Sequence, residues 1–446
     1  MSYARFYSGL MNPMYESVDR EDYVVATYLL GARRNEDPIV KATSIAIEQT
    51  TGSWIDVAIE TDEVRRKYAG KVFGVYEVPV DICNEFDLEN YKAEIRYYVV
   101  RIGFPVVNFK NNLPLMMSAV LGNSMSLPRI RCLDIDFPES FVSDFQGPKF
   151  GIEGIRDYLG IYGRPILNNM IKPCTGWTPE EGAPLFYEAA VGGVDYIKDD
   201  ELIGGNTSFN KVVDRVKRNM EMAAKADAIK GEKTMYTVNI TDEVVFLERN
   251  AKAALKAGAN ALMVDVNCVG LSSLRMLAEN PEINVPIIAH PTGYGSTSAS
   301  LNNGYNYNVL IKLVRLCGAD IQLAINPYGK LDNLKHASVS NINHMRNKFY
   351  NIKSSLPMIG GGTVPGNIQK MIEETGIDCI IGAGAAIHGF PDGPRAGAMA
   401  LRQAIDCSVK GENLNEYAKT HKELDTALKI WGSSDSENNV KKNYLI

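Results

Sequence analysis

The chain has 446 residues, of which 45% are hydrophobic and 22% charged, and its formal net charge is −6. This composition is ordinary for a globular protein and excludes a chain that is disordered as a whole. The acidic balance leaves no basic excess that would favour nucleic acid or an anionic membrane as a partner. Neither a membrane-spanning apolar run nor an N-terminal signal core is present, and the seven cysteines form no CxxC pair. We therefore expect a cytoplasmic protein with reduced thiols.

Residues 1–150 predict an N-terminal α+β domain. Runs rich in β-branched and aromatic residues predict strands, at residues 23–30, 71–78 and 97–102. A helix is expected over residues 38–51, before Gly52. No low-complexity linker follows, so the boundary near residue 150 is a change of pattern.

Residues 151–446 predict a (β/α)8 barrel with a C-terminal helical tail. Eight short apolar runs alternate with longer amphipathic segments, which indicates parallel strands in the number and size of such a barrel. The strand candidates are residues 166–170, 194–197, 235–240, 261–266, 285–289, 321–325, 357–359 and 379–381. A doubly wound open sheet is the alternative.

Four consecutive charged residues, 198–201, end the second predicted barrel strand. Chemistry in barrels is located where strands end, and strand alternation places Lys198 and Asp200 on one face. The first strand leads Lys172 to the same mouth. Carboxylates at Asp200 and Glu201 are suitable ligands for Mg²⁺. Taken alone, this run is equally well interpreted as a solvated loop with a weak ion pair.

Glycine-rich segments follow the seventh and eighth strands, at residues 360–366 and 382–384. Two such loops on neighbouring strands favour a phosphate site, because backbone N–H groups can approach an anion closely there; turn glycines are the alternative. His290 ends the fifth strand, where a site role competes with a structural one. His388, just past the last glycine cluster, fits either interpretation.

These motifs together resemble the ribulose-bisphosphate carboxylase large-subunit superfamily (RuBisCO) over nearly the whole chain. The resemblance implies that CO₂ carbamylates Lys198, and that the carbamate binds one Mg²⁺ together with Asp200 and Glu201. It implies that Lys172 is the base that removes a proton beside the substrate carbonyl. Such a buried lysine can have a depressed pKa.

Further site residues follow from the same resemblance. Glu48 and Asn123 belong to segments similar to the two N-terminal segments that complete a partner subunit's active site, which implies a homodimer or higher oligomer. Lys330 is similar to the lysine of the family's mobile loop 6, and His290 joins the catalytic set. The implied phosphate contacts are Ser53, Trp54, Gly361, Gly362, Gly382 and Ala383.

Several departures from the family's pattern indicate the form IV branch, the RuBisCO-like proteins. Pro291, Leu323 and Gly360 stand where the family has an Arg, a His and a Ser that hold a second phosphate, and Tyr294 replaces a further His. Cys174 replaces a second site lysine. Losing several charged contacts together is incompatible with a bisphosphate. We therefore expect Mg²⁺-dependent enolase or isomerase chemistry on a phosphorylated ketose or related monophosphate, without carbon fixation.

The resemblance leaves several activities open. Known ones in this branch include a diketo-methylthiopentyl-phosphate enolase of methionine salvage, an isomerase, and decarboxylases or transcarboxylases. The salvage enolase has a lysine at the position of Asn123, which counts against it. A true carboxylase, a Schiff-base aldolase using Lys172 or Lys198, and a non-catalytic phosphometabolite sensor compete with the enolase. Residues 303–307 are interpreted as a Gly/Asn-rich surface turn; the alternative is a loop that shapes the non-phosphate end of the site.

Overall fold

The computed structural model describes residues 8–52, 55, 57–79, 94–328 and 335–433. The chain forms two compact units, one of Met1–Phe145 with Gly293–Leu313 and one of Gln146–Thr292 with Val314–Ile446. The first stretch of this unit ends at Phe145, close to the boundary predicted near residue 150. The unit also includes residues 293–313, which were predicted to belong to the barrel.

The first unit is built on a five-stranded sheet with the order β12-β4-β1-β3-β2. Its strands are β1 (Tyr23–Arg33), β2 (Lys71–Glu77), β3 (Ile95–Pro105), β4 (Ile130–Asp136) and β12 (Asn303–Tyr305). The antiparallel β1–β3 pair is long and continuous, running from Tyr23 opposite Pro105 to Arg33 opposite Ile95. The three predicted strands are present, whereas β4 and β12 were not anticipated.

Strand β12 overturns the interpretation of residues 303–307 as a surface turn. Asn303–Tyr305 pairs in parallel with β4, with Gly304 opposite Arg131. The Arg131 guanidinium donates to the carbonyls of Asn303 at 2.9 Å and Ser298 at 2.8 Å, and to the side chain of Asn306 at 2.6 Å. One buried arginine on β4 therefore satisfies the polar groups of a segment whose local composition is typical of a turn.

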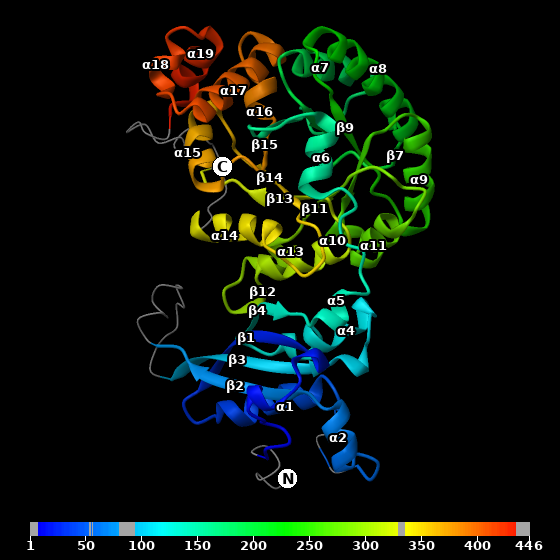
Figure 1. Ribbon diagram of the computed structural model, residues 1–446, viewed down its shortest axis with the longest axis vertical. Helices are drawn as coiled ribbons and strands as arrows, with labels where there is room; N and C mark the ends of the chain where they lie inside the picture. Colours follow the sequence, from blue (N-terminus) through cyan, green and yellow to red (C-terminus); the bar gives the residue numbers. More distant parts are fainter. Residues whose placement is uncertain (1–7, 53–54, 56, 80–93, 329–334, 434–446) are drawn as a thin grey trace. The chain divides into compact units, whose positions relative to one another are not determined.

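The second unit is a closed barrel of eight parallel strands in the order β10-β11-β13-β14-β15-β5-β6-β9 (Figure 1). The strands are β5 (Ile166–Met170), β6 (Tyr196–Lys198), β9 (Met235–Asn239), β10 (Ala261–Asp265), β11 (Ile287–His290), β13 (Ile321–Ile325), β14 (Leu356–Gly360) and β15 (Ile380–Ala383). All eight predicted strands are present, and closure of the sheet excludes the doubly wound alternative. A small separate hairpin consists of β7 (Asn206–Thr207) and β8 (Asn210–Lys211).

The helices are capped by local sequence signals. Thr178 and Glu181 form a capping box at the start of α7, and Gly231, with φ of +73°, ends α8. The first unit has α1 (Pro38–Glu48), α2 (Asp62–Tyr68), α4 (Leu113–Val120), α5 (Glu139–Val142), α12 (Gly295–Ser298) and the 3-10 helices η2 (Tyr15–Ser17), η3 (Arg20–Asp22), η4 (Val106–Asn108) and η5 (Asn123–Ser126). The second has α6 (Gly151–Leu159), α7 (Pro179–Val191), α8 (Val212–Lys230), α9 (Val244–Lys256), α10 (Val266–Val269), α11 (Leu271–Glu279), α14 (Lys335–Arg346), η6 (Pro365–Asn367), α15 (Ile368–Thr375), α16 (Ala385–His388), α17 (Gly393–Lys410), α18 (Leu414–Ala418) and α19 (Lys422–Trp431), while α13 (Tyr307–Leu316) spans both. No helix in the described ranges is long and apolar enough to cross a membrane.

An apolar layer fills the amino-terminal half of the barrel. All eight barrel strands contribute a buried residue at or near their first position to one cluster, which also includes Ile155 and Leu159 of α6. The layer consists of Ile166, Tyr196, Met235, Ala261, Met263, Ile288, Ile321, Leu356, Met358 and Ile380. The amino end is therefore a packed core, and the polar groups inside the barrel are concentrated toward the carboxyl ends of the strands.

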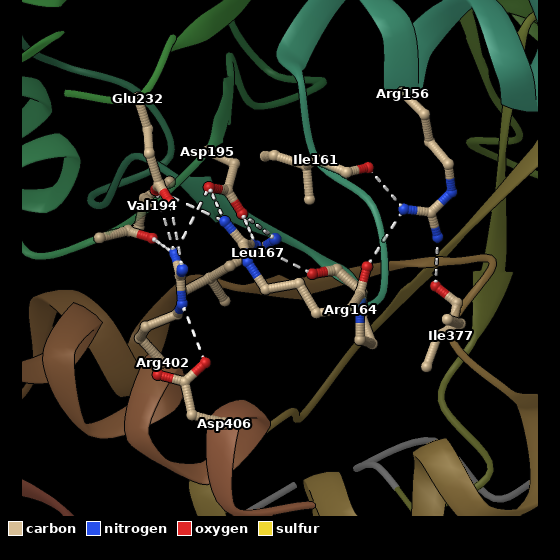
Figure 2. A network of polar contacts seen from close by, with 12 residues as sticks. Arg156, Ile161, Arg164, Leu167, Val194, Asp195, Glu232, Ile377, Arg402 and Asp406 are labelled. Carbon is tan, nitrogen blue, oxygen red and sulfur yellow. Dashed lines mark hydrogen bonds and ion pairs between the residues drawn. The ribbon is translucent and has the colours of Figure 1, made fainter. Parts of the chain in front are cut away.

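An ionic network holds the start of β6 at this packed end (Figure 2). The fully buried Asp195 carboxylate accepts two hydrogen bonds from Arg164, at 2.6 and 2.8 Å, and one from the Leu167 N–H at 2.9 Å. Arg402 of α17 lies 3.6 Å from the same carboxylate and also pairs with Glu232. Asp195 thereby ties β6 to β5 and to an outer helix, three residues before Lys198.

Candidate active site

The charged run that ends β6 divides its side chains between two environments. Asp199 points away from the barrel mouth, where its carboxylate accepts hydrogen bonds from Arg215 at 2.8 Å, Tyr236 at 2.7 Å and the Asn239 N–H at 2.9 Å. Both Asp199 and Arg215 are completely buried. Lys198 and Asp200 therefore share the opposite face, as strand alternation predicts.

Lys198 is the most deeply enclosed amine of the site. It is 1% exposed, and its Nζ donates to the Asp199 carbonyl at 2.8 Å. Burial lowers its pKa below the ordinary 10.5, and the carboxylates of Glu201, Asp200 and Asp265 oppose this shift only in part. Lowering the pKa increases the fraction of neutral amine, which is the nucleophilic form of a lysine.

Lys172 approaches Asp200 from the end of β5. Its Nζ lies 2.7 Å from the Asp200 carboxylate and 2.8 Å from the Cys174 Sγ. Burial lowers the pKa of Lys172, but the hydrogen bonds and charges of these two partners outweigh burial and raise it overall. The pKa of Lys172 is raised here because Asp200 is its anionic partner; a depressed pKa of Lys172 beside bound metal stays a prediction.

His290 lies between two carboxyl groups at the end of β11. Its Nε2 is 3.6 Å from Glu201 Oε2 and its Nδ1 is 3.8 Å from Asp265 Oδ1. Burial, with the charge of Lys198, lowers the His290 pKa to about 3, so the ring is neutral at physiological pH. Burial raises the pKa of Asp265 to about 7. Sequence reasoning missed Asp265, although its place at a barrel strand end is the signal that identified His290.

The glycine segments after β14 and β15 leave little room for side chains. A Cβ on Gly384 would lie 3.0 Å from Cε of Lys172, and one on Gly382 would lie 3.3 Å from both Asn168 Nδ2 and the Ile359 carbonyl. Gly361 has a φ of +97° and Gly362 one of +80°. Close approach at Gly382 and Gly384, and left-handed backbone at Gly361 and Gly362, explain why glycine is used at these positions. Ala383, in the middle of the second segment, is buried. Phosphate binding by these backbones stays a prediction.

A further polar group lies beside Lys172. His388, at the end of α16, pairs through Nε2 with Asn169 Oδ1 at 3.0 Å. Burial, with the positive charge of Lys172, lowers the His388 pKa to about 4. The sequence left a role for His388 open. The structure places it at the carboxyl end of β5, where Asn169 is its partner and the charge of Lys172 acts on it.

The two N-terminal site candidates lie together within the first unit. Glu48 is the last residue of α1, and Asn123 begins η5. The carboxamide of Gln49 joins the two elements: oriented with its oxygen toward them, it accepts from the N–H of Ser124 at 2.9 Å and of Asn123 at 3.0 Å. Three further candidates lie outside the described residues: Ser53, Trp54 and Lys330.

The donor set at the mouth fits a magnesium ion only after modification of Lys198. No three His, Cys, Asp or Glu side chains within the described ranges are arranged to hold a metal. Asp200 and Glu201 supply two hard oxygen donors, and a carbamate on the adjacent Lys198 would supply a third. The buried amine with its lowered pKa and the two neighbouring carboxylates are compatible with that ligand set.

Comparisons with known protein families match both parts of the chain. Residues 151–431 match the catalytic domain of the ribulose bisphosphate carboxylase large chain, and residues 9–141 match its N-terminal domain. A ribulose bisphosphate carboxylase-like protein from Archaeoglobus fulgidus is 42% identical over 93% of this chain and 95% of its own. A 2,3-diketo-5-methylthiopentyl-1-phosphate enolase from Geobacillus thermodenitrificans is 33% identical, covering 93% and 99%.

Solved structures of similar proteins share the fold. A Rubisco-like protein (MtnW) from Alicyclobacillus acidocaldarius superimposes with a TM-score of 0.84 at 33% identity, covering 93% of this chain and all of the other. The octameric Rubisco of Pyrococcus horikoshii, in a complex with sulfate, gives a TM-score of 0.85 at 29% identity, covering 94% and 96%. A dimeric archaeal Rubisco from Hyperthermus butylicus gives 0.83 at 28%, covering 94% and 98%.

Proposed function

Because the chain belongs to the ribulose bisphosphate carboxylase large-chain family and is a RuBisCO-like protein, we propose that it catalyses Mg²⁺-dependent enolisation of a phosphorylated ketose or diketone. The observation that carries this proposal is the convergence of Lys172, Lys198, Asp200 and Glu201 at the carboxyl ends of β5 and β6. Reaction of CO₂ with the neutral amine of Lys198 would complete the oxygen ligands. The lowered pKa of Lys198 supports this step, because only an unprotonated amine can attack CO₂.

Proton removal is assigned to Lys172. Bound Mg²⁺ would polarise the substrate carbonyl and so acidify the neighbouring C–H bond. Lys172 is protonated while Asp200 accepts its hydrogen bond at 2.7 Å, so it becomes a base only when that contact is broken. His290, neutral and between Glu201 and Asp265, is positioned to exchange a proton with the oxygen end of the same substrate.

A single phosphate on the substrate is supported by the residues that would face a second one. Leu323 offers no hydrogen-bond donor beyond the backbone, Pro291 has no N–H at all, and Gly360 has no side chain. The glycine segments at 361–362 and 382–384 are the proposed site of the one phosphate. A carboxylase acting on a bisphosphate is correspondingly disfavoured.

The names of the relatives support including diketone monophosphates in the substrate class. The Geobacillus relative is named for a diketone monophosphate, while the more similar Archaeoglobus relative carries no substrate in its name. Asn123, where the salvage enolase has lysine, favours a ketose or a different diketone. Glu48 and Asn123 are proposed to complete the site of a partner subunit, in a homodimer or larger assembly.

Hydrogen exchange at carbon tests the proposal. The full-length protein, with bicarbonate and Mg²⁺, is incubated in D₂O with a panel of ketose and diketone monophosphates, and C–H exchange is followed by NMR. Metal-dependent exchange on a monophosphate and none on ribulose bisphosphate is expected. Exchange with carbon fixation on the bisphosphate, or binding of monophosphates without any exchange, would contradict the proposal.

Two lysine variants distinguish the loss of the proposed carbamate from the general effect of removing a buried amine. Lys198→Ala should abolish Mg²⁺-dependent exchange. Lys230→Met is the matched control, because Lys230 is also largely buried but donates to the Val194 carbonyl at the amino end of the barrel; it should retain exchange. Full Mg²⁺-dependent activity in Lys198→Ala would refute the carbamate. A borohydride-trapped adduct with substrate would instead indicate a Schiff-base aldolase.

A further inference from the structure

Asp265 and His290 form a side-by-side pair at the ends of adjacent barrel strands. Strands β10 and β11 are parallel, and their register places Asp265 directly opposite His290. Paired residues of neighbouring strands point to the same face of the sheet. The register itself therefore brings the carboxylate and the imidazole together inside the mouth.

The two atoms that face one another are unsatisfied within the described part of the chain. Asp265 Oδ1 and His290 Nδ1 are both buried and without a hydrogen bond among the described residues. They are 3.8 Å apart, and their side chains are only 5% and 10% exposed. Buried polar atoms are normally paired, and contacts in unliganded sites often shorten when substrate binds.

We propose that Asp265 is a positioning residue that accepts a hydrogen bond from His290 Nδ1–H and thereby keeps Nε2 free of hydrogen. A neutral imidazole has a single N–H, so the partner of one ring nitrogen decides the state of the other. His290 Nε2 points toward Glu201, at 3.6 Å, on the side of the proposed substrate site. With Nδ1 carrying the hydrogen, Nε2 is an acceptor that can receive a proton from the substrate.

With Asp265 ionised, the opposite tautomer would leave two buried acceptors facing one another. An Nε2–H ring would direct the lone pair of Nδ1 at Asp265 Oδ1, which is unfavourable when the carboxylate is ionised. Asp265 thus acts on the reaction through His290 and without touching substrate. This inference rests on the proposed function for its kinetic test, in which C–H exchange is measured. The tautomer of His290 can be measured without any turnover.

The test reads the tautomer directly. Protein labelled with ¹⁵N-histidine is examined by long-range ¹H–¹⁵N NMR; the chain has five histidines, and the His290 signals are those missing from His290→Gln. Well above pH 7, where Asp265 with its pKa of about 7 is ionised, the wild type should show His290 with hydrogen on Nδ1. Hydrogen on Nε2 in the wild type overturns the proposal, whether or not any variant folds.

Variants then connect the tautomer to turnover. Asp265→Leu removes the acceptor and should abolish the Nδ1–H preference, lowering kcat for C–H exchange about 10–100-fold with KM little changed. Asp242→Asn is the matched control, since this carboxylate on the loop between β9 and α9 accepts a hydrogen bond from Asn250 at 2.9 Å. This substitution should change neither the His290 tautomer nor kcat. An unchanged tautomer in Asp265→Leu overturns the proposal. Absence of exchange in the wild type would refute the proposed function and leave the tautomer result standing.

Discussion

The buried ion pair of Asp199 and Arg215 is the contact on which the geometry of the β6 end depends most. Substituting Asp199→Asn keeps the shape of the side chain and removes its charge. Arg215 would then be a fully buried cation without an anionic partner, although its contacts with the Asn210 carbonyl at 2.8 Å and the Asn239 carbonyl at 3.2 Å remain. Neighbouring Lys198 and Asp200 would lose the anchor that fixes their direction.

The expected loss of stability follows from the burial of both partners. Removing one member of a buried, hydrogen-bonded ion pair costs about 3–5 kcal/mol, because the other charge is left uncompensated. For units of this general size, 1 kcal/mol corresponds to about 2–4 °C in Tm. Asp199→Asn should therefore lower the Tm of the barrel unit by at least about 6 °C.

Differential scanning calorimetry measures this shift, with an exposed ion pair as the control. Glu188 and Arg395 form a hydrogen-bonded pair at 2.8 Å whose side chains are 39% and 46% exposed. Glu188→Gln should change stability by less than about 1 kcal/mol, since solvent screens such pairs. If the two substitutions lower Tm equally, burial is not what makes the Asp199 contact strong, and the reasoning fails.

Three more predictions concern the chemistry of the mouth. Lys172→Met should lower the C–H exchange rate about 10²–10⁴-fold, the usual contribution of a general base, while the protein still binds monophosphate in calorimetric titration; an undiminished rate would exclude Lys172 as the base. Because burial lowers the pKa of Lys198, activation by bicarbonate and Mg²⁺ should accelerate as pH rises and the neutral amine becomes more abundant, which a time course of activation at several pH values would show; a rate that does not change with pH would contradict this. Burial lowers the pKa of His388 from 6.5 to about 4, so between these values the unfolded chain binds the extra proton, and stability should fall by about 1.4 kcal/mol per pH unit as pH decreases. In urea unfolding, His388→Gln should remove that part of the slope, and an unchanged slope would show that His388 is protonated equally in both states.

Local pattern was sufficient to predict the barrel. Each of its strands is a short apolar run flanked by helix-forming segments, and this alternation is a property of the chain alone. The same holds for the candidate site residues at strand ends, because a strand's last inward residue is found by counting along it. Lys172, Lys198, Asp200 and His290 were identified in this way.

The contacts that the sequence did not predict are with partners distant along the chain. Residues 303–307 have the composition of a turn, but Arg131 and β4 make Asn303–Tyr305 a strand. Lys172 has a raised pKa because Asp200, 28 residues later, lies 2.7 Å away. No pattern in the neighbouring sequence predicts either contact.

The sequence by itself determined the class of the fold, the positions of the strand ends, and the residue types placed there, because periodicity and strand alternation act over a few residues. Only the tertiary structure decided which of those groups meet. Closure of the barrel sets β10 against β11 in the register that pairs Asp265 with His290, and it buries Lys198 where the charge of Asp265, from another strand, acts on its pKa. Burial and charge proximity, which set the protonation of each group, arise only when distant strands come together.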